Sequence, residues 1–314
     1  MIFYITGPDS YRAHQKVKEL KDKFLREVDP TGLNLAVIDG EKLSAGDLPH
    51  FFDTASLLAR RRCLIIKRIL ASKDKKLGEA VVARLGRERK ADDHIVIFLE
   101  SDEPPVKNSL HLWLITHAHY QKFFWLKGQA LKKYIEDKAK EFNRSITARA
   151  VQQLCERSQE DLWQIMNDLQ KCHAFLPSGQ PIDEATISEL TVEPVDAAVF
   201  PLLDSVLKGD LSLAAPRLMD YLRQGESPQQ LVSMLEGQLR TLLVLSAGQK
   251  GGHKALAGVH PYVIKKIAPL AASRRPADIK KIYRALSEVD HDLKTTSIDP
   301  KLLFIRFLTL ACET

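Results

Sequence analysis

Residues 2–14 read Ile2-Phe3-Tyr4-Ile5-Thr6-Gly7-Pro8-Asp9-Ser10-Tyr11-Arg12-Ala13-His14. A short apolar strand that runs through a glycine into a helix start is where a nucleotide-binding α/β domain places its phosphate loop. The full pattern requires glycine, lysine and then serine or threonine where this chain has Arg12, Ala13 and His14. Arg12 lacks the access of glycine to positive φ, Ala13 has no ammonium group for a phosphate, and His14 has no hydroxyl for Mg²⁺. We therefore predict a degenerate phosphate loop, marked by Gly7, with no cofactor and no catalytic residue, in a protein that works by binding partners.

The composition is typical of a chain with two or three domains and no membrane partner. The 314 residues are 45% apolar, which suffices for several cores, and no window approaches 18 uninterrupted apolar residues. Residues 1–5 lack the basic segment and cleavage site of a signal peptide. None of the four cysteines forms a C-x-x-C pair, so we expect neither a metal site nor a disulfide framework, and a reducing cytoplasm fits.

Positive charge is concentrated in two blocks of the chain. The net charge is +6, yet residues 60–90 carry twelve basic and three acidic residues, and residues 248–286 carry nine and one. Two basic blocks in an otherwise acidic chain indicate a phosphate-rich partner such as DNA. Solvated helix faces are the alternative interpretation.

The first 125 residues alternate between strand and helix patterns. Short apolar runs predict strands at Ile2–Thr6, Asn34–Ile38, Cys63–Ile69, His94–Leu99 and Tyr120–Trp125. Residues 9–27 form an amphipathic helix pattern that Asp9 or Ser10 can cap. This alternation predicts a doubly wound parallel sheet.

After Trp125 the pattern becomes helical. We predict helices at 129–142, 147–157, 159–175, 183–190, 196–208, 211–223, 228–247, 261–271, 277–291 and 300–312. Trp163 is expected in the core of the first helical group. The predicted domains are an α/β domain (1–127), a small helical domain (128–192) and a larger helical domain (193–314).

Several stretches, in this order, resemble the delta-subunit family of bacterial DNA polymerase III, within the AAA+ clamp-loader class. The stretches are Gly7-Pro8-Asp9-Ser10-Tyr11, residues 56–66, Leu131-Lys132-Lys133-Tyr134-Ile135, residues 161–171 with D-L-x-x-x-x-N-D-L-x-K spacing, residues 260–266, and Asp290-His291-Asp292-Leu293-Lys294. The resemblance covers nearly the whole chain. It implies an AAA+-like domain, a helical lid and a helical collar.

The resemblance also implies a function. Family members bind and open the beta sliding clamp for loading onto primed DNA, and they neither bind nor hydrolyse ATP. They join the gamma/tau ATPase subunits and the delta-prime subunit mainly through the C-terminal domain, at the replication fork in the cytoplasm. The nominal class of the holoenzyme is DNA-directed DNA polymerase, a nucleotidyltransferase.

Leu57 and Leu58 are the main candidates for contact with the clamp. In the family, an apolar pair at this position inserts into a pocket on the clamp, with Ser56, Arg60 and Arg61 beside it. Some relatives carry phenylalanine where this chain has Leu58. The alternative is that one or both leucines pack in their own core, because adjacent residues do not share a helix face.

The second basic block offers a further candidate surface. Its six main cations are Lys265, Lys266, Arg274, Arg275, Lys280 and Lys281. Contact with DNA and contact with acidic neighbouring subunits both remain open for these residues.

Three other functions compete with the clamp-loader interpretation. An active P-loop ATPase is disfavoured by Ala13. A delta-prime-like stator would bind the ATPase subunits without strong clamp binding, but its Ser-Arg-Cys motif is missing here. A simple DNA-binding helical protein would bind DNA tightly in isolation.

Overall fold

The computed structural model describes residues 1–52, 61–88, 94–100, 108–191, 195–247, 256, 259–271 and 274–313. The chain divides into two compact units, Met1–Leu126 and Lys127–Thr314. Each unit has its own hydrophobic core. The predicted division of the second unit at residues 192 and 193 stays a prediction.

The first unit is built on a five-stranded parallel sheet in the order β2-β3-β4-β1-β5. The strands are β1 (Ile2–Thr6), β2 (Leu35–Asp39), β3 (Arg62–Lys67), β4 (His94–Leu99) and β5 (His119–Lys122). β1 and β4 have the predicted bounds, and β5 ends three residues earlier than expected. The parallel sheet and the helices that follow it confirm the predicted fold class, an α/β part followed by an all-α part.

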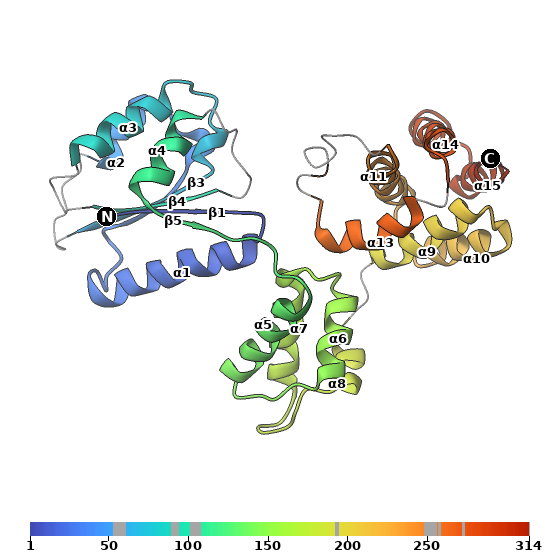
Figure 1. Ribbon diagram of the computed structural model, residues 1–314, viewed down its shortest axis with the longest axis horizontal. Coiled ribbons are helices and arrows are strands. Elements are labelled where there is room, and N and C mark those ends of the chain that lie inside the picture. Colours follow the sequence, from blue (N-terminus) through green and yellow to red (C-terminus); the bar gives the residue numbers. More distant parts are fainter. Residues whose placement is uncertain are drawn as a thin grey trace. The chain divides into compact units, whose positions relative to one another are not determined.

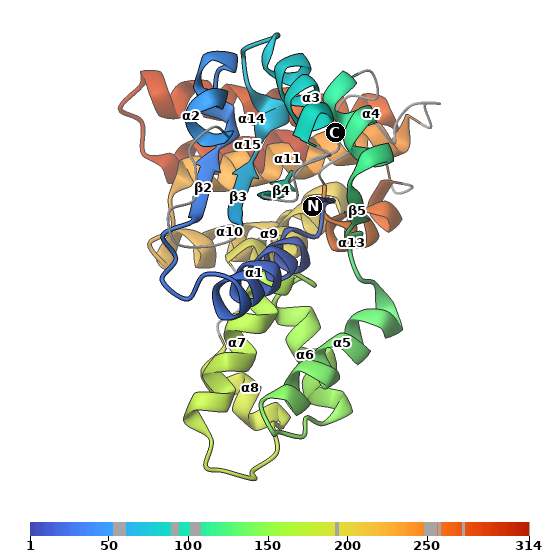
Figure 2. The same ribbon diagram turned by 90° about the vertical axis from the view of Figure 1, so that its left-hand side faces the viewer.

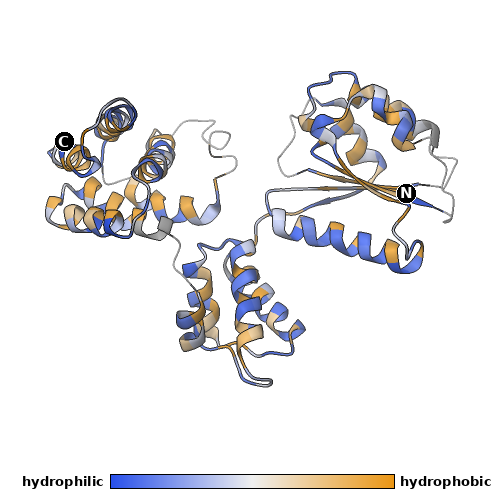
Figure 3. Ribbon diagram, turned by 180° about the vertical axis from the view of Figure 1, so that it is seen from behind, coloured by the Kyte–Doolittle hydropathy of each residue, from blue (hydrophilic) through white to orange (hydrophobic). Residues whose placement is uncertain are grey.

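Helices cover both faces of this sheet, as Figures 1 and 2 show. One face packs against α1 (Ser10–Glu27), and the other packs against α2 (Leu48–Phe52), α3 (Leu77–Glu88) and α4 (Ser109–His117). Alternate residues of β3 divide between the two cores: Cys63 and Ile65 face α1, whereas Leu64 and Ile66 face the other layer. Burial on both faces explains why the central strands β1, β3 and β4 are continuous apolar runs (Figure 3). Short 3₁₀ turns lie at Gly40–Lys42, Ala45–Asp47 and Ile69–Ala71.

The described part of the second unit is built from helices, with one isolated parallel β-bridge between Ile146 and Ile182. Its first four helices are α5 (Gly128–Glu141), α6 (Ala148–Arg157), α7 (Leu162–Phe175) and α8 (Glu184–Leu190). They are followed by α9 (Val195–Lys208), α10 (Leu211–Arg223), α11 (Pro228–Ser246), α13 (Pro261–Ala271), α14 (Pro276–Thr295) and α15 (Pro300–Cys312). The later helices share one core that includes Leu203, Leu239, Ile282 and Phe304. Among the described residues, no helix is both long enough and apolar enough to span a membrane.

The prediction that Trp163 lies in the core of the first helical group is wrong. Its side chain is 43% exposed, whereas Leu162, Ile165 and Leu169 are buried. Because each residue rotates about 100° around a helix, Trp163 falls at the edge of the stripe that these side chains define.

Candidate functional site

The phosphate-loop position at the carboxyl end of β1 is occupied by the chain itself. Gly7 has φ +122°, and a Cβ atom there would lie 2.1 Å from the carbonyl oxygen of Phe123. The Phe123 amide donates to the Thr6 carbonyl (2.8 Å), and the Asp9 amide donates to the Phe123 carbonyl (3.2 Å). Glycine is therefore required here by the approach of residue 123. The Asp9 amide, which would face a phosphate in an active loop, is used internally.

The N-terminus of α1 already holds a carboxylate. Asp9 is 3% exposed, and its side chain accepts from the Arg12 amide (3.0 Å) and the Arg12 guanidinium (3.2 Å). Arg12 also donates to the Phe124 carbonyl (3.1 Å) and lies over the Phe123 ring. A helix N-terminus favours one anion. A phosphate placed here would meet the negative charge of Asp9, so this arrangement opposes nucleotide binding.

The side chains at the next two positions of the loop, Ala13 and His14, make contacts within the first unit. Ala13 is 1% exposed and packs in the core between α1 and the sheet. The Nδ1 atom of His14 lies 2.8 Å from the Ser10 carbonyl oxygen, within α1 itself. Neither side chain offers a group to a phosphate or to Mg²⁺.

The acidic position after β4 is buried. Glu100 is 6% exposed and accepts a hydrogen bond from the Leu70 amide (3.2 Å), so it ties β4 to the turn after β3. Residues 101–103, which include the later acidic pair, lie outside the described residues. Among the described residues, no group of three His, Cys, Asp or Glu side chains is placed to hold a metal ion.

The predicted clamp-binding pair and two of its neighbours, Ser56 and Arg60, lie outside the described residues. The residues on either side of that segment, up to Phe52 and from Arg61, are described. Phe52 is 2% exposed in the core, and Arg62 at the start of β3 donates to the Phe51 carbonyl (3.1 Å). Arg61 is partly buried. Because β1 and β3 are parallel, these flanks lie at the amino edge of the sheet, opposite the phosphate-loop edge.

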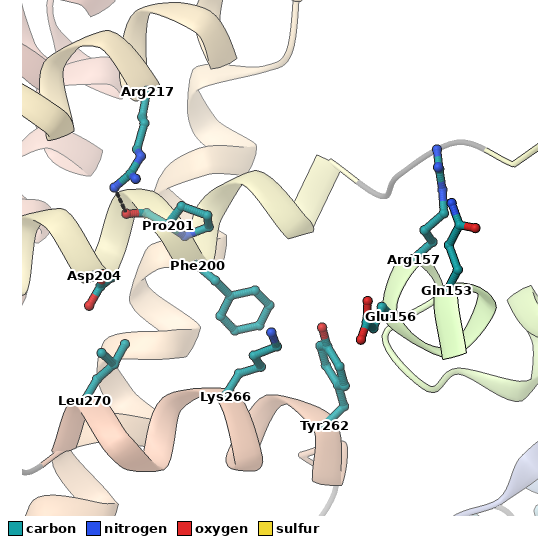
Figure 4. Close-up of a pocket in the computed structure, with 10 residues that line it drawn as sticks. All are labelled: Gln153, Glu156, Arg157, Phe200, Pro201, Asp204, Arg217, Tyr262, Lys266 and Leu270. Carbon is teal, nitrogen blue, oxygen red and sulfur yellow. Dashed lines mark hydrogen bonds between the residues drawn. The ribbon is translucent and has the colours of Figure 1, made fainter. Parts of the chain in front are cut away.

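Lys265 and Lys266, two cations of the second basic block, lie on α13 close to acidic residues of α6 and of the turn after it. Lys265 lies 3.7 Å from Glu160, and the Lys266 ammonium lies 5.6 Å from the centroid of the Tyr262 ring. Lys266, Tyr262, Phe200 and Glu156 line a cavity of about 620 Å³ that also contains Arg157, Arg217 and Asp204 (Figure 4). Cations and carboxylates are mixed in this cavity, so it is not a dedicated anion site.

The remaining four cations divide into two pairs. The Arg274 Nε donates to the Leu207 carbonyl (2.6 Å), and Arg275 donates twice to Asp278 (2.9 and 3.2 Å). These hydrogen bonds from Arg275 hold the pKa of the Asp278 carboxyl below its usual range. Lys280 and Lys281 are exposed on α14. The structure thus separates cations with local structural contacts from cations that point to solvent.

Sequence reasoning missed three side chains near the second basic block: Arg240, Tyr283 and Arg284. Tyr283 and Arg284 line the same groove as Lys280 on α14, and Arg240 reaches the Tyr283 hydroxyl because α11 packs along α14. Tyr283 and Arg284 are close to the basic block in sequence, and their spacing from Lys280 was an available signal. Arg240 is distant in sequence, and only the packing of the two helices brings it there.

Comparison with known proteins finds a family match within the second unit. Residues 196–310 match the family described as "DNA polymerase III delta subunit, C-terminal domain". The whole chain is similar to DNA polymerase III subunit delta of Bacillus subtilis strain 168, with 21% identity over 98% of this chain and 91% of that protein.

The fold is similar to that of one solved delta protein over the whole chain. The solved structure of the Bacillus subtilis DNA clamp loader delta protein superposes with a TM-score of 0.74 at 21% identity, covering 100% of this chain and 95% of that one. The predicted resemblance to delta subunits of DNA polymerase III is thereby confirmed. All six cations of the second basic block lie inside the matched C-terminal domain.

Proposed function

We propose that this chain is the non-catalytic subunit of a bacterial replicative clamp loader that binds and opens the sliding clamp. The single observation that carries the proposal is the match of residues 196–310 to the C-terminal domain of delta subunits. The similarity over nearly the entire chain to a DNA polymerase III subunit delta supports it. The chain then acts in DNA replication, in the cytoplasm, as part of a polymerase complex.

The closed phosphate loop supports the absence of ATP hydrolysis in this chain. Asp9 holds the N-terminus of α1, and the backbone at Phe123 lies against Gly7. ATP binding and hydrolysis then belong to the neighbouring gamma/tau subunits. A titration of the purified chain with Mg-ATP should show no saturable binding. Saturable binding would instead support the alternative that the chain is an active P-loop ATPase.

The proposed contact with the clamp is made by the first unit. Leu57 and Leu58 insert into an apolar pocket on the clamp, and Ser56, Arg60 and Arg61 lie at the edge of the contact. Anchors of this kind contribute about 2 kcal/mol or more each. Binding favours an open ring because the chain has a higher affinity for that state, and differential affinity is what shifts such an equilibrium.

Assembly with the ATPase subunits and with delta-prime is assigned to the second unit. The outer side of α15 and the preceding turn expose three large apolar side chains: Ile298, Leu302 and Ile305. Leu302 is 60% exposed although it lies in a helix of the main core. An exposed apolar stripe at helical spacing is typical of a protein interface. Primed DNA is then held within the assembled loader.

Reconstitution tests this function. The chain is mixed with the cognate ATPase subunits, delta-prime, the sliding clamp, Mg-ATP and primed circular DNA, and loaded clamp is counted. We expect loading to depend on the chain. Loading that proceeds equally without it, or a chain that joins the ATPase subunits but does not bind the clamp, would contradict the proposal and favour a stator.

A further inference from the structure

A groove in the C-terminal domain lies between the end of α11 and the first half of α14. It encloses about 630 Å³, and its walls are Leu243 and Ala247 from α11, and Pro276, Ala277, Lys280, Tyr283 and Arg284 from α14. The floor is mainly aliphatic, whereas Lys280 and Arg284 are exposed at the rim. The groove therefore combines an apolar interior with a cationic edge.

The cations at this edge are not neutralised within the described residues. No carboxylate in the described part of the chain lies within ion-pair distance of Lys280, Arg284 or Arg240. Arg240 extends the edge on the α11 side, where its Nη2 lies 3.5 Å from the Tyr283 hydroxyl oxygen.

The acidic side chains near this edge have hydrogen-bond or ion-pair partners of their own. Asp278 is held by Arg275, Glu236 accepts from the Ser287 hydroxyl (3.4 Å), and Glu288 lies 3.9 Å from Arg306. The hydrogen bond to Tyr283 and then the charge of Glu236 raise the pKa of Arg240, so Arg240 is partly compensated. The exposed Lys280 and Arg284 are the main charges left for a partner.

The groove walls are fixed in position. Pro276 is the first residue of α14, where its missing amide hydrogen costs nothing. Arg275 donates two hydrogen bonds to Asp278 across the first turn of α14. The preceding residue, Arg274, donates from its Nε atom to the Leu207 carbonyl. These contacts hold the start of α14, where Pro276 and Ala277 form one wall of the groove.

We infer that this groove is a docking site for an acidic protein segment that carries an apolar side chain. The aliphatic floor receives the apolar side chain, and Arg240, Lys280 and Arg284 pair with carboxylates beside it. Charge complementarity identifies the occupant, because Lys280 and Arg284 line the apolar recess and Arg240 contacts its Tyr283 wall, and none of the three forms an ion pair with another described residue.

Single-stranded nucleic acid fits the groove less well. Bases bind by stacking on flat aromatic faces. Here the one aromatic side chain among the groove-lining residues, Tyr283, has its hydroxyl engaged by Arg240, and the rest of the floor is aliphatic. The inference does not depend on clamp binding, which is assigned to the other unit.

Fluorescence anisotropy with the full chain tests the inference. Three labelled probes of equal net charge are compared: a peptide of Asp and Glu with a central Leu-Phe pair, the same peptide with Ser-Ser at the centre, and oligo-dT. We expect the Leu-Phe peptide to bind at least tenfold more tightly than the other two. Equal binding of the Ser-Ser peptide, tighter binding of oligo-dT, or no binding of any probe would overturn the inference.

Variants locate the binding. Lys280→Glu/Arg284→Glu should weaken the Leu-Phe peptide at least tenfold, and Ala277→Trp should do the same by filling the floor without changing charge. Both sites are exposed, so both variants should fold. Lys281→Glu makes the same type of charge change outside the groove and should alter affinity less than twofold. If Lys281→Glu lost as much affinity for the Leu-Phe peptide, binding would depend only on the net charge of the protein, and the assignment to the groove would be overturned.

Discussion

At the scale of single residues, the conformation of Gly7 determines how β1 leads into α1. A side chain there would have to adopt φ +122° and would overlap the backbone of Phe123. We expect Gly7→Ala to lower the free energy of unfolding by roughly 2–4 kcal/mol, because the main chain must move. Urea denaturation measures this.

Gly86 provides the matched control. It lies inside α3, and no atom lies within 4 Å of the position that a Cβ would occupy there. Gly86→Ala should raise the free energy of unfolding by about 0.5–1 kcal/mol, since it removes the entropic cost of a helical glycine. Similar destabilisation by both substitutions would contradict the role given to Gly7.

Asp9 is the second residue at this scale, since it caps α1 in place of a phosphate. Asp9→Ala should cost about 1 kcal/mol of unfolding free energy, because the Arg12 amide and guanidinium lose their acceptor. Asp22→Ala removes an exposed carboxylate from the same helix and should change stability by less than about 0.5 kcal/mol. Equal effects of the two variants in thermal melts would show that Asp9 is not a cap.

At the scale of elements, Arg144 fastens the segment between α7 and α8. Its guanidinium is largely buried and donates to the carbonyls of His173, Leu176, Pro177 and Gln180. We expect Arg144→Ala to cost roughly 2–4 kcal/mol, because several carbonyls lose a charged donor at once.

Arg144→Lys should rescue little of this loss, since a single ammonium cannot reach four carbonyls in a fixed fork. Arg149→Ala, at an exposed position of α6, is the control. Full rescue by lysine in a chemical denaturation series would disprove the role of the fork.

The cap of α10 predicts a pH dependence. The Asp210 carboxylate accepts from the Ser212 hydroxyl (2.6 Å) and the Leu213 amide (3.1 Å), and these bonds lower its pKa. A carboxyl with a lowered folded pKa stabilises the protein above its unfolded pKa of about 3.9. That contribution is lost as pH falls through the folded value.

Asp210→Asn should therefore be less stable than wild type at pH 6, and the difference should shrink at pH 3. Urea midpoints at the two pH values measure this. Asp220→Asn removes a charge from the same helix at an exposed position that is not the N-cap, and its effect is the control. A difference for Asp210→Asn that stays constant between the two pH values would contradict the lowered pKa.

The helices and strands of this chain are largely encoded locally, which is why their pattern could be predicted. Helix caps such as Asp9 and apolar runs such as His94–Leu99 depend on neighbouring residues alone. The groove depends on how α11 packs along α14, and no local signal joins Arg240 to Tyr283. Trp163 was misplaced because an apolar residue inside an apolar helix does not reveal how wide the buried stripe is.

At the scale of the whole molecule, we assign different partners to different surfaces. Asp9, Arg12 and Phe123 fill the carboxyl edge of the sheet, and we propose that this edge binds no nucleotide. The clamp is assigned to the segment between Phe52 and Arg61. The other loader subunits are assigned to the C-terminal domain that matches the delta family.

The binding of the purified chain to the cognate sliding clamp tests the central claim most directly. Surface plasmon resonance compares wild type, Leu57→Ala/Leu58→Ala, and Leu33→Ala/Leu112→Ala, a control that removes two exposed leucines of the same unit. We predict that the first variant binds roughly 1,000-fold more weakly, equivalent to about 4 kcal/mol for the two anchors. The control should bind as wild type does. Equal affinity of all three proteins, or no binding by the folded wild type, would contradict the proposed contact with the clamp.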